Sequence, residues 1–132
     1  MSLVSCPCGS PSYAACCKPF HDRGCHAPCA EALMRSRYSA YALGLSGYVL
    51  STWHASTRPA HLDLQNELKQ GKWLGLQVLK HLEDSDTATV EFVARYKPKS
   101  AAASRLHERS RFVKEEGCWW YVDGDLFDER RP

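Results

Sequence analysis

A chain of 132 residues that is 44% hydrophobic and 24% charged has the size and composition of one globular domain. Its formal net charge of +2 excludes a strongly basic, histone-like nucleic-acid binder, although a local basic patch stays open. No apolar run approaches the ~18 residues that a membrane span needs, and residues 1–10 lack the features of a secretion signal. We therefore expect a cytoplasmic protein with no membrane segment.

Six of the seven cysteines lie in the first 29 residues, a segment that has neither a helical nor a strand period. These six are Cys6, Cys8, Cys16, Cys17, Cys25 and Cys29. An odd number of cysteines without a secretion signal favours reduced thiols and a metal site over disulfides. Cys118, far along the chain, is interpreted as an ordinary strand residue.

The strongest candidate metal site consists of Cys6, Cys8, Cys16 and Cys17. Gly9 permits the sharp turn that brings the first two thiols to one ion, and the loop to Cys16 is long enough to fold back. Four thiolates complete the tetrahedron that zinc prefers, so such a site is structural rather than catalytic. Free or oxidisable thiols are the alternative interpretation.

A second metal half-site is a weaker hypothesis. Cys25 and Cys29 are four residues apart, and His21 and His26 are close to them in the sequence. Residues in such an arrangement are more often incidental, and the sequence leaves open whether Cys25 or Cys29 joins the main site.

Helices are predicted first along the chain. Residues 30 to about 45 carry an apolar stripe at helical spacing, and Gly44 and Gly47 mark its end. Residues 48–54 form a second short helical stretch. A third candidate helix opens at Pro59 and ends before Gly71.

Strands follow after Trp73, where the hydrophobic period changes to two. Alternation runs through residues 74–78, 90–96, 106–114 and 118–123, and Glu116-Gly117 is typical of a tight turn. Helices followed by a strand meander predict an α+β fold, with the helices packed on one face of an antiparallel sheet.

The pattern Cys-x-Cys-Gly-Ser…Tyr…Cys-Cys over residues 6–17 resembles the SEC-C motif, the zinc-binding knuckle at the C-terminus of the SecA translocase. With it, six further motifs resemble the YchJ-like family of uncharacterised bacterial proteins. They are Leu33–Tyr38, Thr52–His54, Trp73–Leu76, Phe92–Arg95, Glu108–Phe112 and Trp120–Gly124. The resemblance implies a nuclear-transport-factor-2-like (cystatin-like) cone over residues 30–127. A zinc knuckle in residues 1–29 precedes the cone, and residues 128–132 form a frayed tail.

One buried charge is predicted on the first helix. Arg37 falls inside the apolar stripe beside Tyr41, and Glu108 shares the apolar face of its strand with Phe112. An unpaired buried guanidinium is costly, so we expect Arg37 to pair with Glu108, or with Asp123 in its place. The pair either fixes the helix to the sheet or lines a pocket in the cone.

Candidate catalytic residues are few. His54 is a lone general-base candidate, while Glu108 and Asp123 are candidate acids. No nucleophile elbow, P-loop or dinucleotide fingerprint is present. The sequence therefore favours a binding protein over an enzyme, although the isomerase and dehydratase chemistry that such cones can host stays an alternative.

A basic stretch is the last candidate surface. Residues 95–114 hold seven Lys or Arg and one acid, and Arg105, Arg109 and Arg111 share one strand face. This face either contacts RNA or an acidic partner, or is a solvated surface offset by the acidic residues that follow. The expected partners are thus a protein at the zinc knuckle, a small molecule in the cone, nucleic acid on the basic face, or a second copy.

Overall fold

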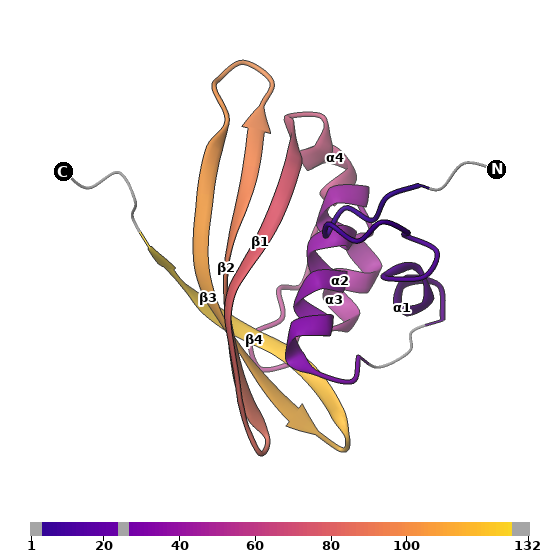
Figure 1. Cartoon of the computed structure of the whole chain (residues 1–132), viewed down its shortest axis with the longest axis vertical. Helices are drawn as coiled ribbons and strands as arrows, with labels where there is room; N and C mark the ends of the chain where they lie inside the picture. The colour runs from indigo at the N-terminus through magenta and orange to yellow at the C-terminus, as the bar shows by residue number, and fades with distance from the viewer. Residues whose placement is uncertain (1–3, 24–26, 128–132) are drawn as a thin grey trace.

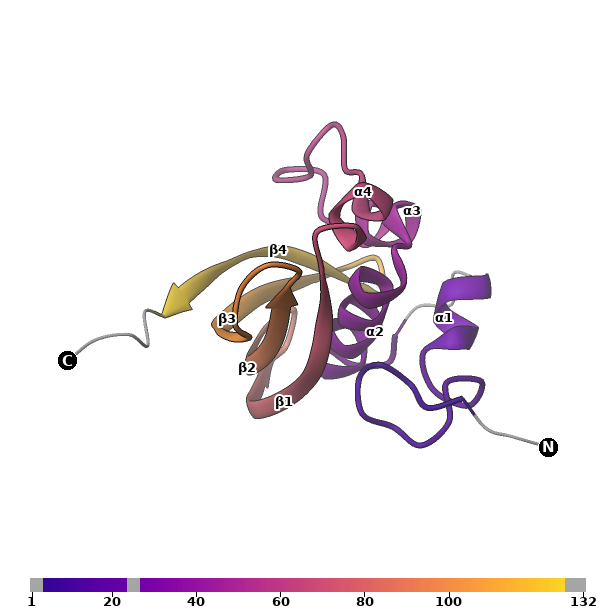
Figure 2. The same ribbon diagram turned by 90° about the horizontal axis from the view of Figure 1, so that it is seen from above.

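Three layers stack across the molecule in the computed structural model, which describes residues 4–23 and 27–127. A twisted four-stranded sheet is the first layer, helix α2 (Ala30–Leu43) is the second, and the N-terminal segment with α1 (Lys18–Arg23) is the third (Figures 1 and 2). The short helices α3 (Ser46–Ser51) and α4 (Leu64–Leu68) complete the helical side. The predicted tail, residues 128–132, lies outside the described residues.

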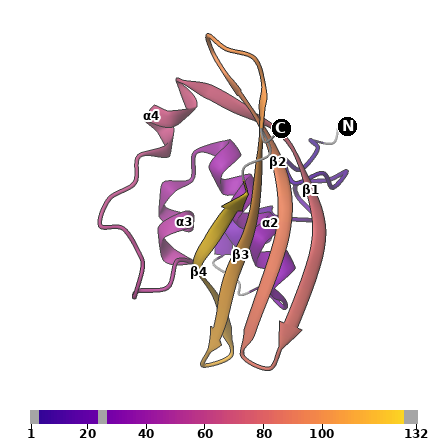
Figure 3. The ribbon, with the colours of Figure 1, turned by 90° about the vertical axis from the view of Figure 1, so that its left-hand side faces the viewer.

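The sheet is an antiparallel meander in the order β1-β2-β3-β4, as expected for strands that follow one another in the chain (Figure 3). Its strands are β1 (Gly71–Asp84), β2 (Thr87–Pro98), β3 (Ser104–Glu115) and β4 (Cys118–Phe127). The predicted turn at Glu116-Gly117 is confirmed. Both residues have positive φ, 54° and 81°, as a two-residue hairpin turn matching the strand twist requires.

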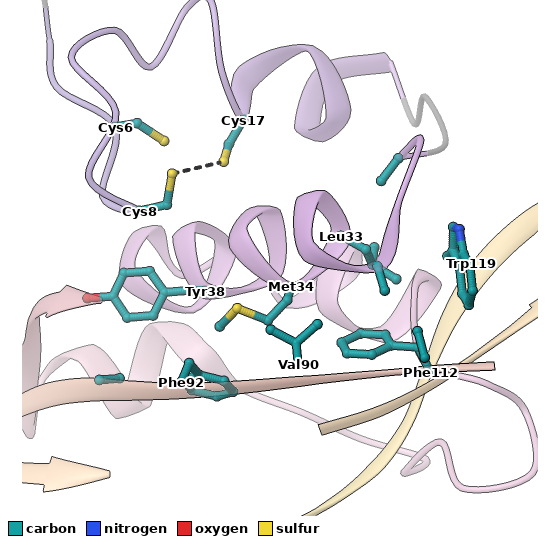
Figure 4. Close-up of a cluster of buried hydrophobic side chains, with 14 residues drawn as sticks. Cys6, Cys8, Cys17, Leu33, Met34, Tyr38, Val90, Phe92, Phe112 and Trp119 are labelled. Carbon is teal, nitrogen blue, oxygen red and sulfur yellow. Dashed lines mark hydrogen bonds between the residues drawn. The ribbon is translucent and has the colours of Figure 1, made fainter. Parts of the chain in front are cut away.

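Helix α2 is buried on two faces, which explains its small hydroxyl residues. Leu33, Met34 and Tyr38 pack toward the sheet and join Phe92 and Phe112 in the core (Figure 4). Ser36, Ser39 and Ala40 are also buried, on the side covered by the N-terminal segment and α3. The core therefore extends on both sides of one helix, and the sequence predicted only the sheet-facing stripe.

The helix predicted from residue 30 to about 45 is confirmed, whereas the next two are shorter than predicted. After α3 the chain leaves the helix because Trp53 bridges to Tyr121 and the His54 N–H donates to the Tyr121 carbonyl at 2.7 Å. The third helix starts at Leu64 rather than Pro59, capped by the Asp63 carboxylate, which accepts from the Asn66 N–H at 3.1 Å. None of the described helices has the length and apolarity to cross a membrane.

Replacing Gly44 by alanine is expected to lower the free energy of unfolding by about 1–3 kcal/mol. Gly44 ends α2 in the left-handed region at φ 78°, and a Cβ there would collide with the side chains of Gln65 and Leu68. Gly47→Ala is the matched control, since its Cβ meets nothing within 4 Å and alanine favours the helix. Urea denaturation measures both variants, and equal losses would contradict the role given to Gly44.

Candidate metal centre and cone pocket

A tight turn positions the first two cysteines of the N-terminal segment. The Gly9 N–H donates to the Cys6 carbonyl at 3.0 Å, and the Cys6 N–H donates to the Ser10 carbonyl at 2.9 Å. Gly9 has φ 112°, a conformation that favours glycine, as the sequence predicted. The turn leaves Cys6 and Cys8 buried next to α2 (Figure 4).

The next two cysteines come from the turn that leads into α1. The four sulfur atoms of Cys6, Cys8, Cys16 and Cys17 all lie within 4.8 Å of one another. The Cys8 sulfur is 3.6 Å from that of Cys16 and 3.9 Å from that of Cys17, and the last two sulfurs are 3.8 Å apart. A disulfide needs about 2.05 Å, so these are free thiols. Together they can hold one metal ion.

Helix α2 supports this cluster from below. The Ser39 hydroxyl, fully buried on α2, donates to the Cys17 sulfur at 3.3 Å and lies 3.4 Å from the Cys6 sulfur. The Arg35 guanidinium donates to the Cys8 carbonyl at 3.3 Å. Sequence reasoning missed both residues. The only signal was a serine in the middle of a helix, where hydroxyl side chains are not favoured unless they bond to something.

Hydrogen bonds among the thiols give them different pKa values. The Cys17 thiol donates to Cys8, and this bond lowers the pKa of Cys8 to about 4. The same bond, together with burial, raises the pKa of Cys17, and burial raises that of Cys16. Without a metal, Cys8 is thus favoured as a thiolate beside protonated Cys16 and Cys17, and a bound cation would favour the thiolate form of its ligands.

The second predicted half-site gains no support from its described members. Cys25 and His26 lie outside the described residues. Both ring nitrogens of His21 are engaged, Nδ1 with the Tyr13 hydroxyl at 2.7 Å and Nε2 with the Ser36 carbonyl at 2.8 Å. Cys29 immediately precedes α2 and is not part of the four-sulfur cluster.

On the opposite side of α2, a cavity of about 220 Å³ opens between the helix and the sheet. Its apolar walls are Met34, Trp73, Phe92, Ala94, Leu106 and Phe112. Its polar groups are Arg37, Tyr38, Tyr41, Glu108, Ser110 and Tyr121. All three residues predicted to share a pocket, Arg37, Tyr41 and Glu108, therefore line one cavity.

The predicted ion pair between Arg37 and Glu108 is wrong. In the described part of the chain no carboxylate lies within 4.0 Å of the Arg37 guanidinium. Its Nη1 donates instead to the Val49 carbonyl at 2.8 Å and the Thr52 hydroxyl at 2.7 Å. The guanidinium also lies 4.3 Å from the centre of the Tyr121 ring, and the hydroxyl of the same tyrosine contacts Glu108. Asp123 does not replace Glu108, because it pairs with Arg111.

Hydrogen bonds from its own strand, β3, and from the neighbouring strand β4 hold the Glu108 carboxylate. Its Oε2 accepts from the Ser110 hydroxyl at 2.7 Å and from the Tyr121 hydroxyl at 3.4 Å. Gly124 on β4 makes room for this carboxylate, since a Cβ there would collide with Oε2. Burial and the nearby Glu108 charge raise the pKa of Tyr121, so its hydroxyl stays a donor at neutral pH.

The other two catalytic candidates lie outside the cavity. His54 forms hydrogen bonds to the Ser56 hydroxyl at 2.7 Å and to the Glu115 carboxylate at 3.0 Å. Asp123 accepts from Arg111 at 2.6 Å. Neither residue lines the cavity, so of the three candidates only Glu108 faces it.

The strand face predicted to be basic is partly neutralised by the next strand. Arg111 also pairs with Asp125 at 2.7 Å, and Arg109 lies 3.8 Å from the same carboxylate. The β3–β4 register sets these pairs, because Arg109 stands opposite Asp125 and Arg111 opposite Asp123. Arg105 lies at the far end of β3, where it lines a second cavity of about 260 Å³ beside α4. The ion pairs of Arg109 and Arg111 with the acids of β4 favour a solvent-exposed strand face of balanced charge over a surface for nucleic acid.

Comparisons with known proteins agree with this architecture. The model of the YchJ middle NTF2-like domain family matches residues 29–124. A UPF0225 protein of Polaromonas naphthalenivorans is 51% identical, covering 92% of this chain and 97% of the relative. A UPF0225 protein of Bordetella parapertussis is also 51% identical, covering 95% of each chain.

Two solved structures share the whole arrangement. The solution structure of a SEC-C motif containing protein from Rhodopseudomonas palustris has a TM-score of 0.83 and 36% identity, covering 95% of this chain and all of that one. The crystal structure of a SEC-C motif containing protein from Psychrobacter arcticus has a TM-score of 0.78 and 30% identity, covering 97% of this chain and 85% of that one. Both solved relatives are described as SEC-C motif containing proteins, and the chain belongs to the YchJ-like UPF0225 family, with an NTF2-like domain preceded by a cysteine-rich segment.

Proposed function

We propose that the four cysteines hold a structural zinc ion and that the protein acts as a binding protein through its cone. The spacing of the sulfur atoms carries the proposal. Zinc–sulfur bonds of about 2.3 Å in a tetrahedron place the sulfurs ~3.8 Å apart. The three distances among the sulfurs of Cys8, Cys16 and Cys17 are 3.6, 3.8 and 3.9 Å, and the Cys6 sulfur lies within 4.8 Å of each. Thiolate ligands also favour zinc over magnesium or calcium.

The position of the cluster supports a structural role for the metal. Four thiolates leave no coordination position for water or substrate. The cluster also lies on one side of α2, whereas the cavity lies on the other (Figure 4). In this proposal the metal fixes the N-terminal segment onto α2, and the same rigid turn presents its outer surface to a protein partner.

A binding role for the cone is better supported than catalysis. The cavity combines mostly apolar walls with a few polar groups, the usual composition of a ligand site. Acid–base catalysis requires a positioned partner for each proton transferred, and among the described residues only Glu108 of the three candidates lines the cavity. The alternative of an isomerase- or dehydratase-like enzyme therefore depends on Glu108 alone.

Native mass spectrometry of reduced protein, purified without added metal, tests this proposal. One zinc per chain is expected, lost on chelation and in a Cys6→Ser variant, because three thiolates bind zinc more weakly than four. Cys118→Ser is the control, since Cys118 lies on β4 outside the cluster. A metal-free chain, or zinc retained in Cys6→Ser but lost in Cys118→Ser, would overturn the assignment.

A further inference from the structure

Arg37 is a buried cation that has no carboxylate partner in the part of the chain that the structure describes. Its side chain is only 5% exposed, and its nearest partners are a carbonyl, a hydroxyl and two aromatic rings. Burial lowers the pKa of Arg37, but a guanidinium remains protonated in proteins. A buried charge is retained at a cost, so its unpaired state calls for an explanation.

Part of the guanidinium is free to bind a ligand. Both hydrogen bonds of the Arg37 side chain use Nη1, and Nε and Nη2 have no protein acceptor within the described ranges. In the same ranges, no fully buried side-chain nitrogen or oxygen lacks a partner. The N–H groups on Nε and Nη2 must therefore reach accessible space, and the cavity is the space that Arg37 lines.

The free groups form the edge of the guanidinium that binds a carboxylate through two parallel hydrogen bonds. Across the Tyr121 ring, the Glu108 carboxylate offers an acceptor to the same cavity. The other walls of the cavity include the aromatic rings of Trp73, Phe92 and Phe112. The cavity therefore presents a cation and an anion together with flat apolar surface.

We infer that the cavity binds a small aromatic carboxylic acid that carries a hydroxyl or amino donor at its other end. The ligand carboxylate binds the free edge of Arg37, and the donor binds Glu108. This inference rests on the proposed binding role of the cone. A volume of about 220 Å³ is below the ~300–1,000 Å³ of ordinary ligand sites, so the ligand is small. Glu108 would repel a multiply charged anion, which excludes phosphate esters.

Three probes that differ by one group each test the inference on the full-length, metal-loaded protein. They are 4-hydroxybenzoate, which carries both groups, benzoate, which carries only the acid, and phenol, which carries only the donor. We expect binding in that order, with 4-hydroxybenzoate about tenfold or more tighter than phenol. Nuclear magnetic resonance titration measures each Kd, and a large shift of the Arg37 Nε–H signal reports the carboxylate directly.

Two substitutions test the contacts at the two ends of the ligand separately. Arg37→Met is expected to weaken benzoate binding by about tenfold to a hundredfold, the range for a hydrogen bond to a charged group. Arg95→Met on the exposed face of β2 is the matched control. Glu108→Gln is expected to remove the advantage of 4-hydroxybenzoate over benzoate while leaving benzoate bound. If Arg37→Met does not fold, Arg37→Lys keeps the charge but loses the two-pronged edge, and it is expected to weaken benzoate.

The outcomes distinguish this inference from the proposed function. Phenol binding as tightly as benzoate, or benzoate binding that survives Arg37→Met or Arg37→Lys, would overturn the ligand class and leave the cone a binding site. Failure of all three probes to bind at millimolar concentration would overturn the ligand class and the small-molecule role of the cone together. The zinc assignment is tested by the metal content alone, whatever the probes do.

Discussion

Removing the proposed zinc ion is expected to lower the free energy of unfolding by at least about 4 kcal/mol, the value for a ligand at a thousandfold excess over its Kd. The reason is that Cys6, Cys8 and Cys17 belong to the same buried cluster as Leu33 and other core residues of α2. Without an ion, four thiols must be buried in contact, and only hydrogen bonds hold the cysteine side chains and the turn at Gly9 in place. Calorimetry before and after chelation measures the loss.

The matched pair Cys8→Ser and Cys118→Ser tests the same expectation without a chelator. Cys8 is 2% exposed and its sulfur contacts those of Cys16 and Cys17, whereas Cys118 is half-buried on β4. Cys8→Ser is expected to show most of the chelation loss and to respond little to chelator. Cys118→Ser should behave as the unmodified chain does. Equal stabilities of the two variants would exclude a structural metal in this cluster.

Local patterns were sufficient for most of the fold. The helix from residue 30 is an apolar stripe closed by a glycine, and the strands are alternating runs separated by turn residues, so each is defined by neighbours in the sequence. The end of α3 could not be predicted, because Trp53 and His54 leave the helix to contact Tyr121, a residue far along the chain. Such long-range pairings override local propensity.

In the candidate site, too, one part could be predicted from the sequence and another part could not. The four cysteines were predictable because a metal cluster in a short segment is visible as spacing, and the structure brings their sulfurs together. The partner of Arg37 was not predictable, since the sequence identifies a buried charge but not which carbonyl or ring lies beside it. Pairing opposite charges predicted Glu108, whereas in the structure Arg37 lies against the Tyr121 ring and Glu108 accepts from the Tyr121 hydroxyl.

Ser39 shows a third kind of limit. Its role depends on the second buried face of α2, which exists only because the N-terminal segment folds over that helix (Figure 4). A hydrogen bond to a metal-binding thiolate is a contact between two separate segments, and neither segment shows it alone. The sequence could therefore predict which four cysteines come together, but not which residues orient them.

Removing a core ring between α2 and the sheet is expected to cause a comparably large loss of stability. Phe112→Ala should lower the free energy of unfolding by about 3–5 kcal/mol, because the ring is 1% exposed and packs in the core with Leu33 and Val90 (Figure 4). Phe127→Ala is the control. Phe127 is 38% exposed and lies against His107 on the outer face, so its loss is expected to cost less than about 1 kcal/mol.

The same substitution also tests whether the cavity belongs to the core. Phe112 forms part of the cavity wall, so removing its ring adds apolar volume to a space that already reaches Arg37. Benzene fills apolar cavities of this kind, and it is therefore expected to raise the melting temperature of Phe112→Ala but not of Phe127→Ala. Urea denaturation and thermal melts with and without benzene measure both effects. A loss of stability that benzene does not reduce would mean that the helix and sheet close over the missing ring, and that the cavity is not held open by the fold.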